Sequence, residues 1–526
     1  MMKPHAKQTA KQTAVQPALL AHIAHWAKER GETIALKGIA LHGEHSMFSY
    51  AVLWQTVKTL AAELKALNAS TIALLADNSP EWIVVDLACQ AAEICLIPLP
   101  AYFSAEQRQN ALDNSRAQIL ISDTAPQGCA LNSLSTLRYV HLDSASSSCV
   151  EFPQGTSKIT YTSGSTSQAK GVCLSTENQC RTASAVNSAL SGLGLESHLA
   201  VLPLATLLEN VAGVYAALLR GATVFLPGLA TLGWGGSSSL NINQLANALD
   251  HYRPNSAIVL PQILKSLCEA CEQGWQAPSS LKFVAVGGAR VAVSQILQAR
   301  QFGLPVYEGY GLSECASVLT LNTPNADLPG SAGKLLNHCH LRFEQGEIIV
   351  SGNSFLGYLG DESSQTNIEV ATGDLGEINN DGFLLLQGRR KNVLVSSYGR
   401  NISPEWLESE LLAIPGIVQC IVVGDDRPYC SALIYPAIDA ETAADTQAID
   451  HAIQRLNSRL PDYAQIKCWL ALEHPFTTTN ELLTANGRLR RPKILEHYAA
   501  EIDTCYANYP DSSKGEYDEL LRTLAS

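Results

Sequence analysis

A loop of small hydroxyl residues that ends in a lysine carries the most specific chemistry of this sequence. Residues 158–175 read KITYTSGSTSQAKGVCLS, with apolar strand-like residues on both sides of the loop. Small residues let backbone N–H groups approach an anion, hydroxyls add donors and Lys170 adds a positive charge. The order differs from a Walker A loop, because the lysine leads into a strand. We therefore predict a polyphosphate site formed by Thr162, Ser163, Gly164, Ser165, Thr166 and Lys170.

Two later glycine-rich segments each present a carboxylate. Residues 307–314 read YEGYGLSE and end in Glu314, a hard oxygen ligand suited to a divalent cation. Residues 372–376 read TGDLG and hold Asp374 between glycines, where a carboxylate can accept two hydrogen bonds from a vicinal diol. Basic residues follow at 388–392 (GRRKN) and 480–491 (NELLTANGRLRR). Taken singly, each segment also fits a solvated surface turn, so their combination carries the argument.

The elements that must position these groups predict an α/β fold. From about 70 to 320, short runs that are apolar on both faces alternate with helical patterns, which is typical of buried parallel strands; examples are 71–75, 94–98, 119–121, 222–226, 257–260 and 283–286. From about 329 to 388, strands joined by Gly- and Asn-rich turns predict a small antiparallel β unit. Periodicity also predicts helices near 17–30, 404–413 and 447–459, and a strand at 418–423.

A second set of elements begins after Gly388, and it sets the predicted domain boundary. We predict a large N-terminal domain at 1–388, built from layered α/β sheets plus the antiparallel β unit. Residues 389–526 are predicted to form a separate, small α+β domain.

Composition excludes several classes of protein. The chain has 526 residues, 46% of them hydrophobic and 16% charged, with a formal charge of −13. Such a chain can bury large cores, and it is too acidic for broad nucleic-acid binding, which needs basic area. We find no apolar run of about 18 residues and no export signal, so we expect no spanning helix and a cytoplasmic location.

The cysteines indicate the same compartment. Fourteen are scattered along the chain, which favours buried thiols in a reducing environment over a disulfide framework. Cys268 and Cys271 have redox or zinc spacing, but with no second pair we expect helix-packing thiols. His338 and His340 flank Cys339, and without a nearby carboxylate or cysteine pair we expect no metal there.

These segments, in this order, resemble the adenylate-forming superfamily, which includes acyl-CoA synthetases, luciferases and peptide-synthetase adenylation domains. The phosphate loop departs from the family pattern at Ser167 and Ala169, where Gly and Pro are usual. The resemblance implies that ATP and Mg²⁺ are used to activate a carboxylic acid as acyl-AMP. It assigns catalysis to Lys170, Glu314 and Arg488, with Glu314 also holding the metal. Its further AMP contacts are Gly288, Ala289, Glu308, Gly309, Tyr310 on adenine, Ser313 on the α-phosphate, and Asp374 and Arg389 on ribose.

The resemblance also implies a second step in which the acyl group passes to a thiol. The small domain is expected to swing about Asn392, withdrawing Arg488 and presenting Tyr398 and Gly399, which would line the thiol channel. The thiol belongs either to CoA or to the phosphopantetheine arm of a carrier protein. An acidic carrier protein would dock on a basic patch, for which Arg488, Arg490, Arg491 and Lys493 are the candidates.

The acyl pocket is expected at residues 202–210 (LPLATLLEN), which resemble the fatty acyl-CoA synthetase branch. Thr206, Leu207 and Leu208 would line it together with Gly287. The carboxylate with which amino-acid-activating relatives bind the α-amino group is missing. We therefore expect a medium- or long-chain fatty acid, and an aryl acid remains open because an apolar slot takes either.

Arg488 is the main departure from the family, which has lysine at this position. Arginine keeps the charge but carries a planar, forked head, so the exchange is not neutral. Beside an active ligase, two other interpretations of the whole sequence stay open, and only the first of them is motivated by Arg488. One is a nucleotide- or acyl-adenylate-binding homologue with reduced adenylation, and the other is an amino-acid adenylation module.

Overall fold

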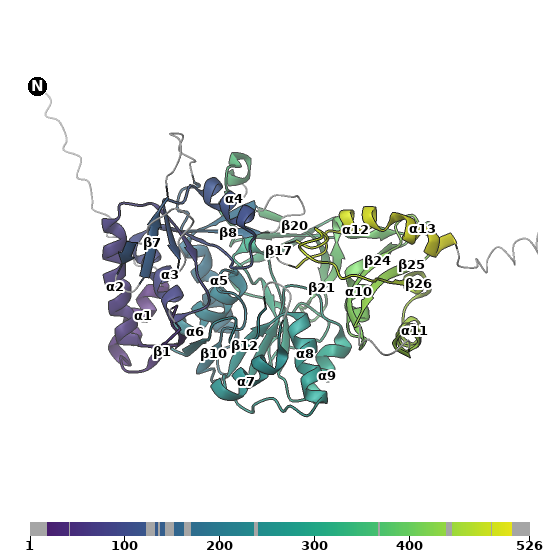
Figure 1. The fold of residues 1–526 in the computed structure, drawn as a ribbon, viewed down its shortest axis with the longest axis horizontal. Coiled ribbons are helices and arrows are strands. Elements are labelled where there is room, and N and C mark those ends of the chain that lie inside the picture. Colours follow the sequence, from purple (N-terminus) through teal and green to yellow (C-terminus); the bar gives the residue numbers. More distant parts are fainter. Residues whose placement is uncertain are drawn as a thin grey trace, which may run out of the picture.

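Two large β-sheets and a smaller β unit form the N-terminal part of the protein, and a separate α+β domain forms the C-terminal part (Figure 1). The computed structural model describes residues 18–41, 43–122, 132–134, 137–142, 152–162, 170–235, 240–366, 369–437, 444–484 and 487–507. The predicted fold class is confirmed, including the small C-terminal domain.

The first large sheet has eight strands in the order β19-β9-β8-β4-β3-β5-β7-β6. Its centre is parallel, since β3 pairs in parallel with β4 and with β5. Its strands are β3 (Thr71–Leu75), β4 (Cys95–Pro98), β5 (Ile119–Ser122), β6 (Asn132–Leu134), β7 (Leu137–His141), β8 (Lys158–Thr162), β9 (Lys170–Leu174) and β19 (Gly357–Tyr358). The helices between them are α2 (Tyr50–Ala66), α3 (Pro80–Ala92), α4 (Ala105–Ser115) and α5 (Thr176–Ala189).

The second large sheet has nine strands in the order β16-β15-β14-β13-β12-β10-β11-β1-β2. Its strands are β1 (Ile34–Ile39), β2 (His45–Ser49), β10 (Ser197–Leu199), β11 (Thr223–Leu226), β12 (Ser256–Val259), β13 (Phe283–Val286), β14 (Val306–Tyr310), β15 (Thr320–Leu321) and β16 (Lys334–Leu335). The associated helices are α1 (Ala18–Glu29), the π-helix η1 (Leu208–Tyr215), α6 (Ala216–Leu219), α7 (Ile242–Tyr252), α8 (Pro261–Glu272), α9 (Val293–Gln301) and the 3₁₀ turn η2 (Ser313–Cys315). One buried cluster joins the two sheets, with members such as Leu36 on β1, Ile72 on β3 and Tyr215 on η1.

Local sequence signals explain why several of these helices begin where they do. Ser79 caps α3 by accepting from the backbone N–H of Trp82, and Pro80 occupies the first helical position. Ser175 and Asn178 form a reciprocal capping box at the start of α5. Because Ser175 follows β9 directly, this cap fixes where the chain leaves the predicted phosphate segment.

The antiparallel β unit is a four-stranded sheet in the order β17-β18-β20-β21. It contains β17 (His340–Glu344), β18 (Glu347–Ser351), β20 (Glu369–Ile378) and β21 (Leu384–Arg389), with the 3₁₀ turn η3 (Glu362–Thr366) before β20. Strand β21 runs across residue 388, so the exact division of the domains at that residue stays a prediction.

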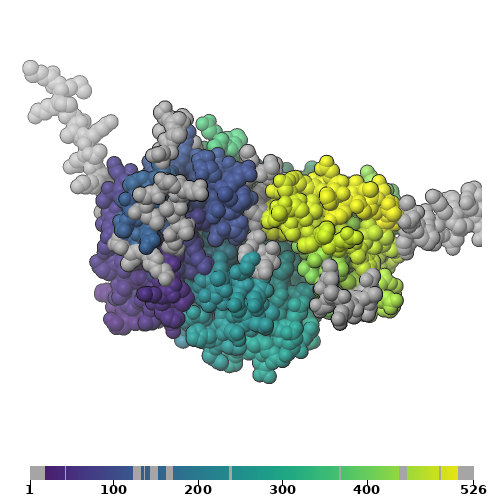
Figure 2. Space-filling view, in the orientation of Figure 1, coloured from purple at the N-terminus to yellow at the C-terminus, as the bar shows by residue number. Residues whose placement is uncertain are grey.

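The C-terminal domain, called the lid below, follows the turn η4 (Arg390–Asn392). It contains the hairpin β22 (Leu394–Val395) and β23 (Asn401–Ile402), then α10 (Pro404–Leu412), β24 (Ile417–Val423), β25 (Cys430–Pro436), α11 (Ala444–Asn457), η5 (Asp462–Ala464), β26 (Ile466–Ala471), α12 (Arg491–His497) and α13 (Ala499–Ala507). Two buried clusters hold it together on the two faces of its three-stranded sheet β24-β25-β26. Figure 2 shows the lid (yellow to green) beside the teal part of the large domain.

One pair of cysteines departs from the expectation of buried thiols. Cys468 on β26 and Cys505 on α13 form a disulfide. Sequence spacing gave no sign of this pair, because only the packing of α13 on β26 brings the two sulfurs together. Ten described cysteines are free, and all are buried except Cys271. In the described ranges no three His, Cys, Asp or Glu side chains gather as a metal site, and no helix is long and apolar enough to cross a membrane.

Candidate active site

Asp374, Arg389 and Tyr310 form a compact polar cluster. Asp374 and Arg389 face each other across β20 and β21, and the Arg389 Nε lies 2.9 Å from Asp374 Oδ1. The Tyr310 hydroxyl donates to Asp374 Oδ2 at 2.7 Å. Burial raises the pKa of Asp374, while the charge of Arg389 acts in the opposite direction. The cluster thus presents a partly desolvated carboxylate between an aromatic ring and a guanidinium, which suits a ribose diol.

Lys170 and Glu314 both contact Tyr358, a residue that the sequence did not single out. The Tyr358 hydroxyl donates to Glu314 Oε1 at 2.8 Å, and Lys170 Nζ lies 4.9 Å from the centre of the Tyr358 ring. Tyr358 reaches this place because β19 pairs with β9, the strand that Lys170 begins. No motif around Tyr358 signals this role, since the contact depends on strand pairing between distant segments.

The two ends of the predicted phosphate loop lie opposite each other. Thr162 at the end of β8 pairs with Lys170 at the start of β9. Ser163, Gly164, Ser165 and Thr166 lie outside the described residues. Their roles therefore stay predictions.

Arg488 extends from the lid towards both carboxylates. Its loop is closed by the Arg488 backbone N–H, which donates to the Thr484 hydroxyl at 3.1 Å, and by Gly487 with φ +73°. The Arg488 side chain is exposed to solvent, yet the protein atoms around it still partly desolvate the guanidinium. This desolvation lowers the pKa of Arg488, the charge of Arg389 lowers it further, and Asp374 and Glu314 oppose the shift. The sequence-predicted cation is thus within electrostatic reach of both carboxylates.

The remaining predicted AMP contacts line β13, β14 and the turns that follow them. Gly288 has φ +86° and is exposed together with Ala289, directly after β13. Glu308 and Gly309 belong to β14, and Ser313 begins η2 next to Glu314. Burial raises the pKa of Glu308 to about 7, although its Oε2 accepts a hydrogen bond from the Gly330 N–H at 2.7 Å.

Residues 202–210, where the acyl pocket is predicted and which are called the acyl corner below, lie against the same strands. A side-chain carbon placed on Gly287 would lie 3.4 Å from the Gly309 carbonyl oxygen and 3.9 Å from Leu208, so these three residues are neighbours. Thr206 folds back and donates to the Pro203 carbonyl at 2.7 Å. Leu207 is only 6% exposed and belongs to the main core, so its role in the acyl pocket stays a prediction.

A buried acid–base pair anchors this corner. Glu209 Oε2 accepts from the Leu202 N–H at 2.8 Å, and Glu209 Oε1 lies 2.7 Å from His198 Nε2. Gly213 sits against the pair, because a side-chain carbon there would approach Glu209 Oε1 to 2.3 Å. The Glu209 side chain therefore holds the turn from 202 to 209 in place by binding the backbone at its first residue, Leu202.

Residues predicted for the hinge and the thiol channel lie at the lid's edge. The Asn392 amide donates to Glu405 Oε1 at 2.6 Å. Tyr398 is 72% exposed, and a side-chain carbon at Gly399 would meet nothing within 4 Å. In this lid orientation both residues thus face solvent rather than a closed channel.

The predicted basic docking patch of Arg488, Arg490, Arg491 and Lys493 stays a prediction, and three of these residues have partners of their own. Arg491 contacts Glu408 inside the lid and donates to the Val422 carbonyl, Lys493 contacts Glu481, and Arg488 faces the cleft.

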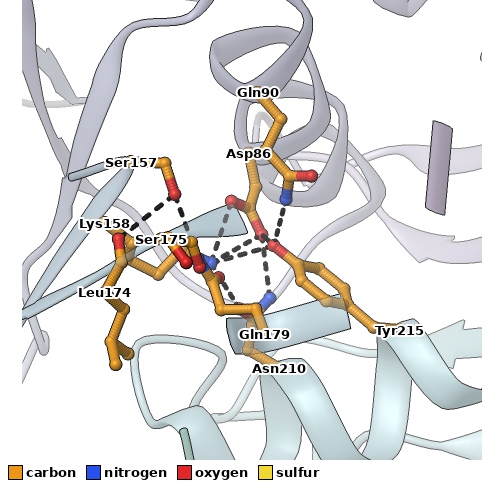
Figure 3. Close-up of polar contacts among 9 residues, drawn as sticks. All are labelled: Asp86, Gln90, Ser157, Lys158, Leu174, Ser175, Gln179, Asn210 and Tyr215. Carbon is orange, nitrogen blue, oxygen red and sulfur yellow. Dashed lines mark hydrogen bonds and ion pairs between the residues drawn. The ribbon is translucent and has the colours of Figure 1, made fainter. Parts of the chain in front are cut away.

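A fully buried charge cluster supports both halves of the site, and sequence reasoning missed it (Figure 3). Lys158 Nζ lies 3.0 Å from Asp86 Oδ1 and donates to the Asn210 amide oxygen at 2.5 Å and to the Tyr215 hydroxyl at 2.9 Å. Lys158 begins β8, which leads to the phosphate segment, and Asn210 and Tyr215 lie on η1, which follows the acyl corner. A lysine in an apolar strand is the only sequence signal, and it does not identify its partner on α3.

The residues present fit a magnesium ion bound together with a nucleotide. Mg²⁺ commonly takes one or two carboxylates plus substrate phosphates and water, and Glu314 offers one carboxylate beside the Lys170 end of the phosphate segment. Glu314 keeps one oxygen beyond the one that Tyr358 contacts. This donor set agrees with ATP-borne magnesium.

The fold and the site together define an adenylate-forming enzyme: a large α/β domain and a lid meet where Asp374, Arg389 and Arg488 lie. Residues 23–359 match the AMP-binding enzyme family, and residues 391–510 match the AMP-binding enzyme C-terminal domain. The chain therefore belongs to the AMP-binding enzyme family, and the predicted superfamily is confirmed.

Similar proteins extend over most of the chain. A 2-succinylbenzoate–CoA ligase of Bacillus licheniformis is 25% identical and covers 87% of this chain and 98% of its own length. A long-chain-fatty-acid–CoA ligase of Mycobacterium bovis is 27% identical over 81% of this chain and 86% of its own. The structure of O-succinylbenzoate coenzyme A synthetase from Bacillus subtilis, in complex with ATP and magnesium ion, superposes with a TM-score of 0.69 at 23% identity, covering 90% of this chain and 98% of that one. The predicted enzyme class, an AMP-forming acid–thiol ligase, is thereby confirmed, and ATP and Mg²⁺ agree with it.

Proposed function

We propose that this enzyme activates an apolar monocarboxylic acid, a fatty acid of medium or long chain, as acyl-AMP and then transfers the acyl group to CoA. The observation that carries the proposal is the meeting of two groups of residues at the lid. Lys170 and Glu314 both contact Tyr358, and Asp374 pairs with Arg389. Arg488 of the lid interacts electrostatically with Glu314, Asp374 and Arg389. Acyl-AMP formation needs cations at the phosphates, a carboxylate for the metal and a grip on ribose, and these residues supply each of them.

In the first step the substrate carboxylate attacks the α-phosphorus of ATP and pyrophosphate leaves. Asp374 and Arg389 orient the ribose, and Tyr310 offers its ring to adenine. Lys170 and Arg488 place positive charge where the transition state gains negative charge on the phosphate oxygens. Glu314, together with the phosphates, would hold a magnesium ion, which would supply positive charge beside the leaving pyrophosphate.

In the second step the lid turns about Asn392, and a thiol attacks the acyl carbonyl with AMP leaving. The exposure of Tyr398 and the open space at Gly399 support this reading, because a lid rotation is required to bring them to the cleft. The similarity to ligases named for CoA supports CoA over a carrier protein as the thiol donor.

The acyl corner supports an apolar acid with a single carboxylate. Leu208 lies beside Gly287, and the described residues 202–210 contain no lysine or arginine that would pair with a second substrate carboxylate. Such a pairing would be needed for a dicarboxylic acid such as 2-succinylbenzoate, because a buried unpaired charge is costly. A cytoplasmic location stays a prediction, supported by the many buried free thiols.

The test is ATP–pyrophosphate exchange with a panel of fatty acids, aryl acids, amino acids and 2-succinylbenzoate, followed by thioester formation with CoA or holo-acyl-carrier protein. We expect exchange with fatty acids and thioester with CoA. Glu314→Gln should lower exchange about 100-fold or more, while Glu29→Gln, an exposed carboxylate on α1, should not. Exchange with 2-succinylbenzoate alone would refute the proposal that the substrate is a fatty acid. ATP binding without any exchange would instead favour a nucleotide-binding homologue.

A further inference from the structure

Lys265, on helix α8 of the large domain, reaches across to the lid. Its Nζ donates to the carbonyl oxygens of Leu412 at 2.7 Å, Ile414 at 3.2 Å and Ile417 at 2.7 Å. These carbonyls come from the last residue of α10, the turn after it and the first residue of β24. The ammonium group thus uses all three of its donors on the other domain.

The lid offers a suitable acceptor at this point. The last carbonyls of a helix lack intrahelical partners and carry the negative end of the helix dipole, so a cation is favoured there. The contact is half-buried, and this desolvation lowers the pKa of Lys265. Hydrogen bonds from a charged donor are stronger than neutral ones, particularly where water is partly excluded.

The same lid helix approaches the large domain at a second place. Glu410 on α10 and Arg290, which follows Ala289, interact electrostatically, and the charge of each opposes the effect of burial on the pKa of the other. The lid is therefore held against the large domain along α10, and in this orientation Arg488 faces Asp374 and Glu314.

We propose that Lys265 is a positioning residue that holds the lid in the orientation for adenylation. Its acceptors and Arg488 belong to one packed domain, since Leu489 packs on the cluster that contains Ile421 and Val423 of β24. A rotation about Asn392 that withdraws Arg488 therefore also carries the three carbonyls away from Lys265. The proposal rests on the two-step function proposed above.

The consequence is a shift in the ratio of the two half-reactions. Each half-reaction rate is proportional to the fraction of enzyme in its own lid orientation, so their ratio follows the equilibrium between the orientations. Two rates are compared: thioester formation from supplied acyl-adenylate, and pyrophosphate exchange. In Lys265→Met, which lacks the Lys265 contacts, the first rate divided by the second should rise about tenfold, equivalent to about 1.4 kcal/mol. A general loss of folding would instead lower both rates together.

Three variants test this on the full-length enzyme. Lys265→Arg should return the ratio to within about threefold of the parent, because arginine keeps the charge and donors. Lys282→Met is the matched control, since Lys282 Nζ donates to the Gly194 carbonyl within the large domain. If Lys265→Met fails to fold in thermal unfolding, Lys265→Gln takes its place.

Small-angle X-ray scattering of the ligand-free proteins measures the lid orientation independently of activity. We expect the profile of Lys265→Met to differ from those of the parent and Lys282→Met. An unchanged half-reaction ratio together with an unchanged profile overturns the role of Lys265. If the parent catalyses neither half-reaction with any acid, the proposed function fails, and the scattering comparison alone decides whether Lys265 holds the lid.

Discussion

Replacing Lys158 by methionine tests the energetics of the buried charge cluster. Lys158 is 1% exposed and Asp86 0% exposed, so solvent does not screen the pair. The variant leaves the Asp86 carboxylate with hydrogen bonds from the Asn210 amide at 2.9 Å and the Tyr215 hydroxyl at 2.6 Å, but without a counter-charge. Removing one partner of a buried ion pair costs about 3–5 kcal/mol.

Protonation of Asp86 limits this cost and makes it depend on pH. A carboxyl with an ordinary pKa of about 3.9 takes up a proton at pH 7 for about 4 kcal/mol and at pH 5 for about 1.5 kcal/mol. Because protonation removes the unpaired buried charge in the folded variant, the stability of the variant should fall as pH rises from about 4 to 7. The stability difference between parent and variant should therefore shrink by about 2–3 kcal/mol between pH 7 and pH 5.

Urea unfolding at pH 5, 6 and 7 measures this difference. Trp82, buried on α3 in the same helix as Asp86, contributes to the fluorescence of the large-domain transition. Lys65→Met, at an exposed lysine of α2, is the control and should change stability by less than about 0.5 kcal/mol. The double variant Lys158→Met/Asp86→Asn should lose the pH dependence. A loss below about 1 kcal/mol at pH 7, or one that does not shrink on acidification, refutes the reasoning.

Three further outcomes follow from the site and the lid. Arg488→Met should lower pyrophosphate exchange about 100-fold but spare thioester formation from supplied acyl-adenylate. Arg488→Lys tests whether the planar guanidinium limits adenylation. An unchanged exchange rate in Arg488→Met would contradict the role of Arg488 in adenylation. Burial raises the pKa of Glu308 to about 7, so ionisation of Glu308 opposes folding as pH rises from about 4.5 to 7. In urea unfolding, Glu308→Gln should therefore gain stability relative to the parent over that range. A stability difference between the two proteins that does not change with pH would count against this. Cys468→Ser removes the disulfide that spans 37 residues and should lower the free energy of unfolding of the lid by about 2–4 kcal/mol. Differential scanning calorimetry measures the loss, with Cys271→Ser as the control. Equal lid stabilities in the two variants would show that the disulfide does not stabilise the lid.

Much of the fold could be predicted from the sequence because its elements are locally specified. The buried strand at 71–75 is confirmed as β3, the strand at 283–286 as β13, and the helix predicted near 404–413 as α10. The antiparallel unit at 329–388 is confirmed as a four-stranded sheet. Apolar runs, glycine turns and serine caps act within a few residues, so the sequence displays them directly.

Part of the candidate site was equally visible. Lys170, Glu314, Asp374 and Arg389 stand in short motifs whose residue types reveal a nucleotide chemistry, and the structure places Asp374 against Arg389 and Lys170 near Glu314 through Tyr358. Their individual roles stay predictions, as do those of the residues between 162 and 170.

The sequence by itself determined the fold class, the chemistry of the motifs and their order along the chain, because each depends on residues close to one another. Only the tertiary structure decided which distant groups meet: Tyr358 with Glu314, Lys158 with Asp86, Lys265 with the end of α10, and Cys468 with Cys505. Each of these contacts depends on how strands pair and how helices pack. Side-chain partners across such interfaces leave no local pattern, since almost any spacing in the chain can bring them together.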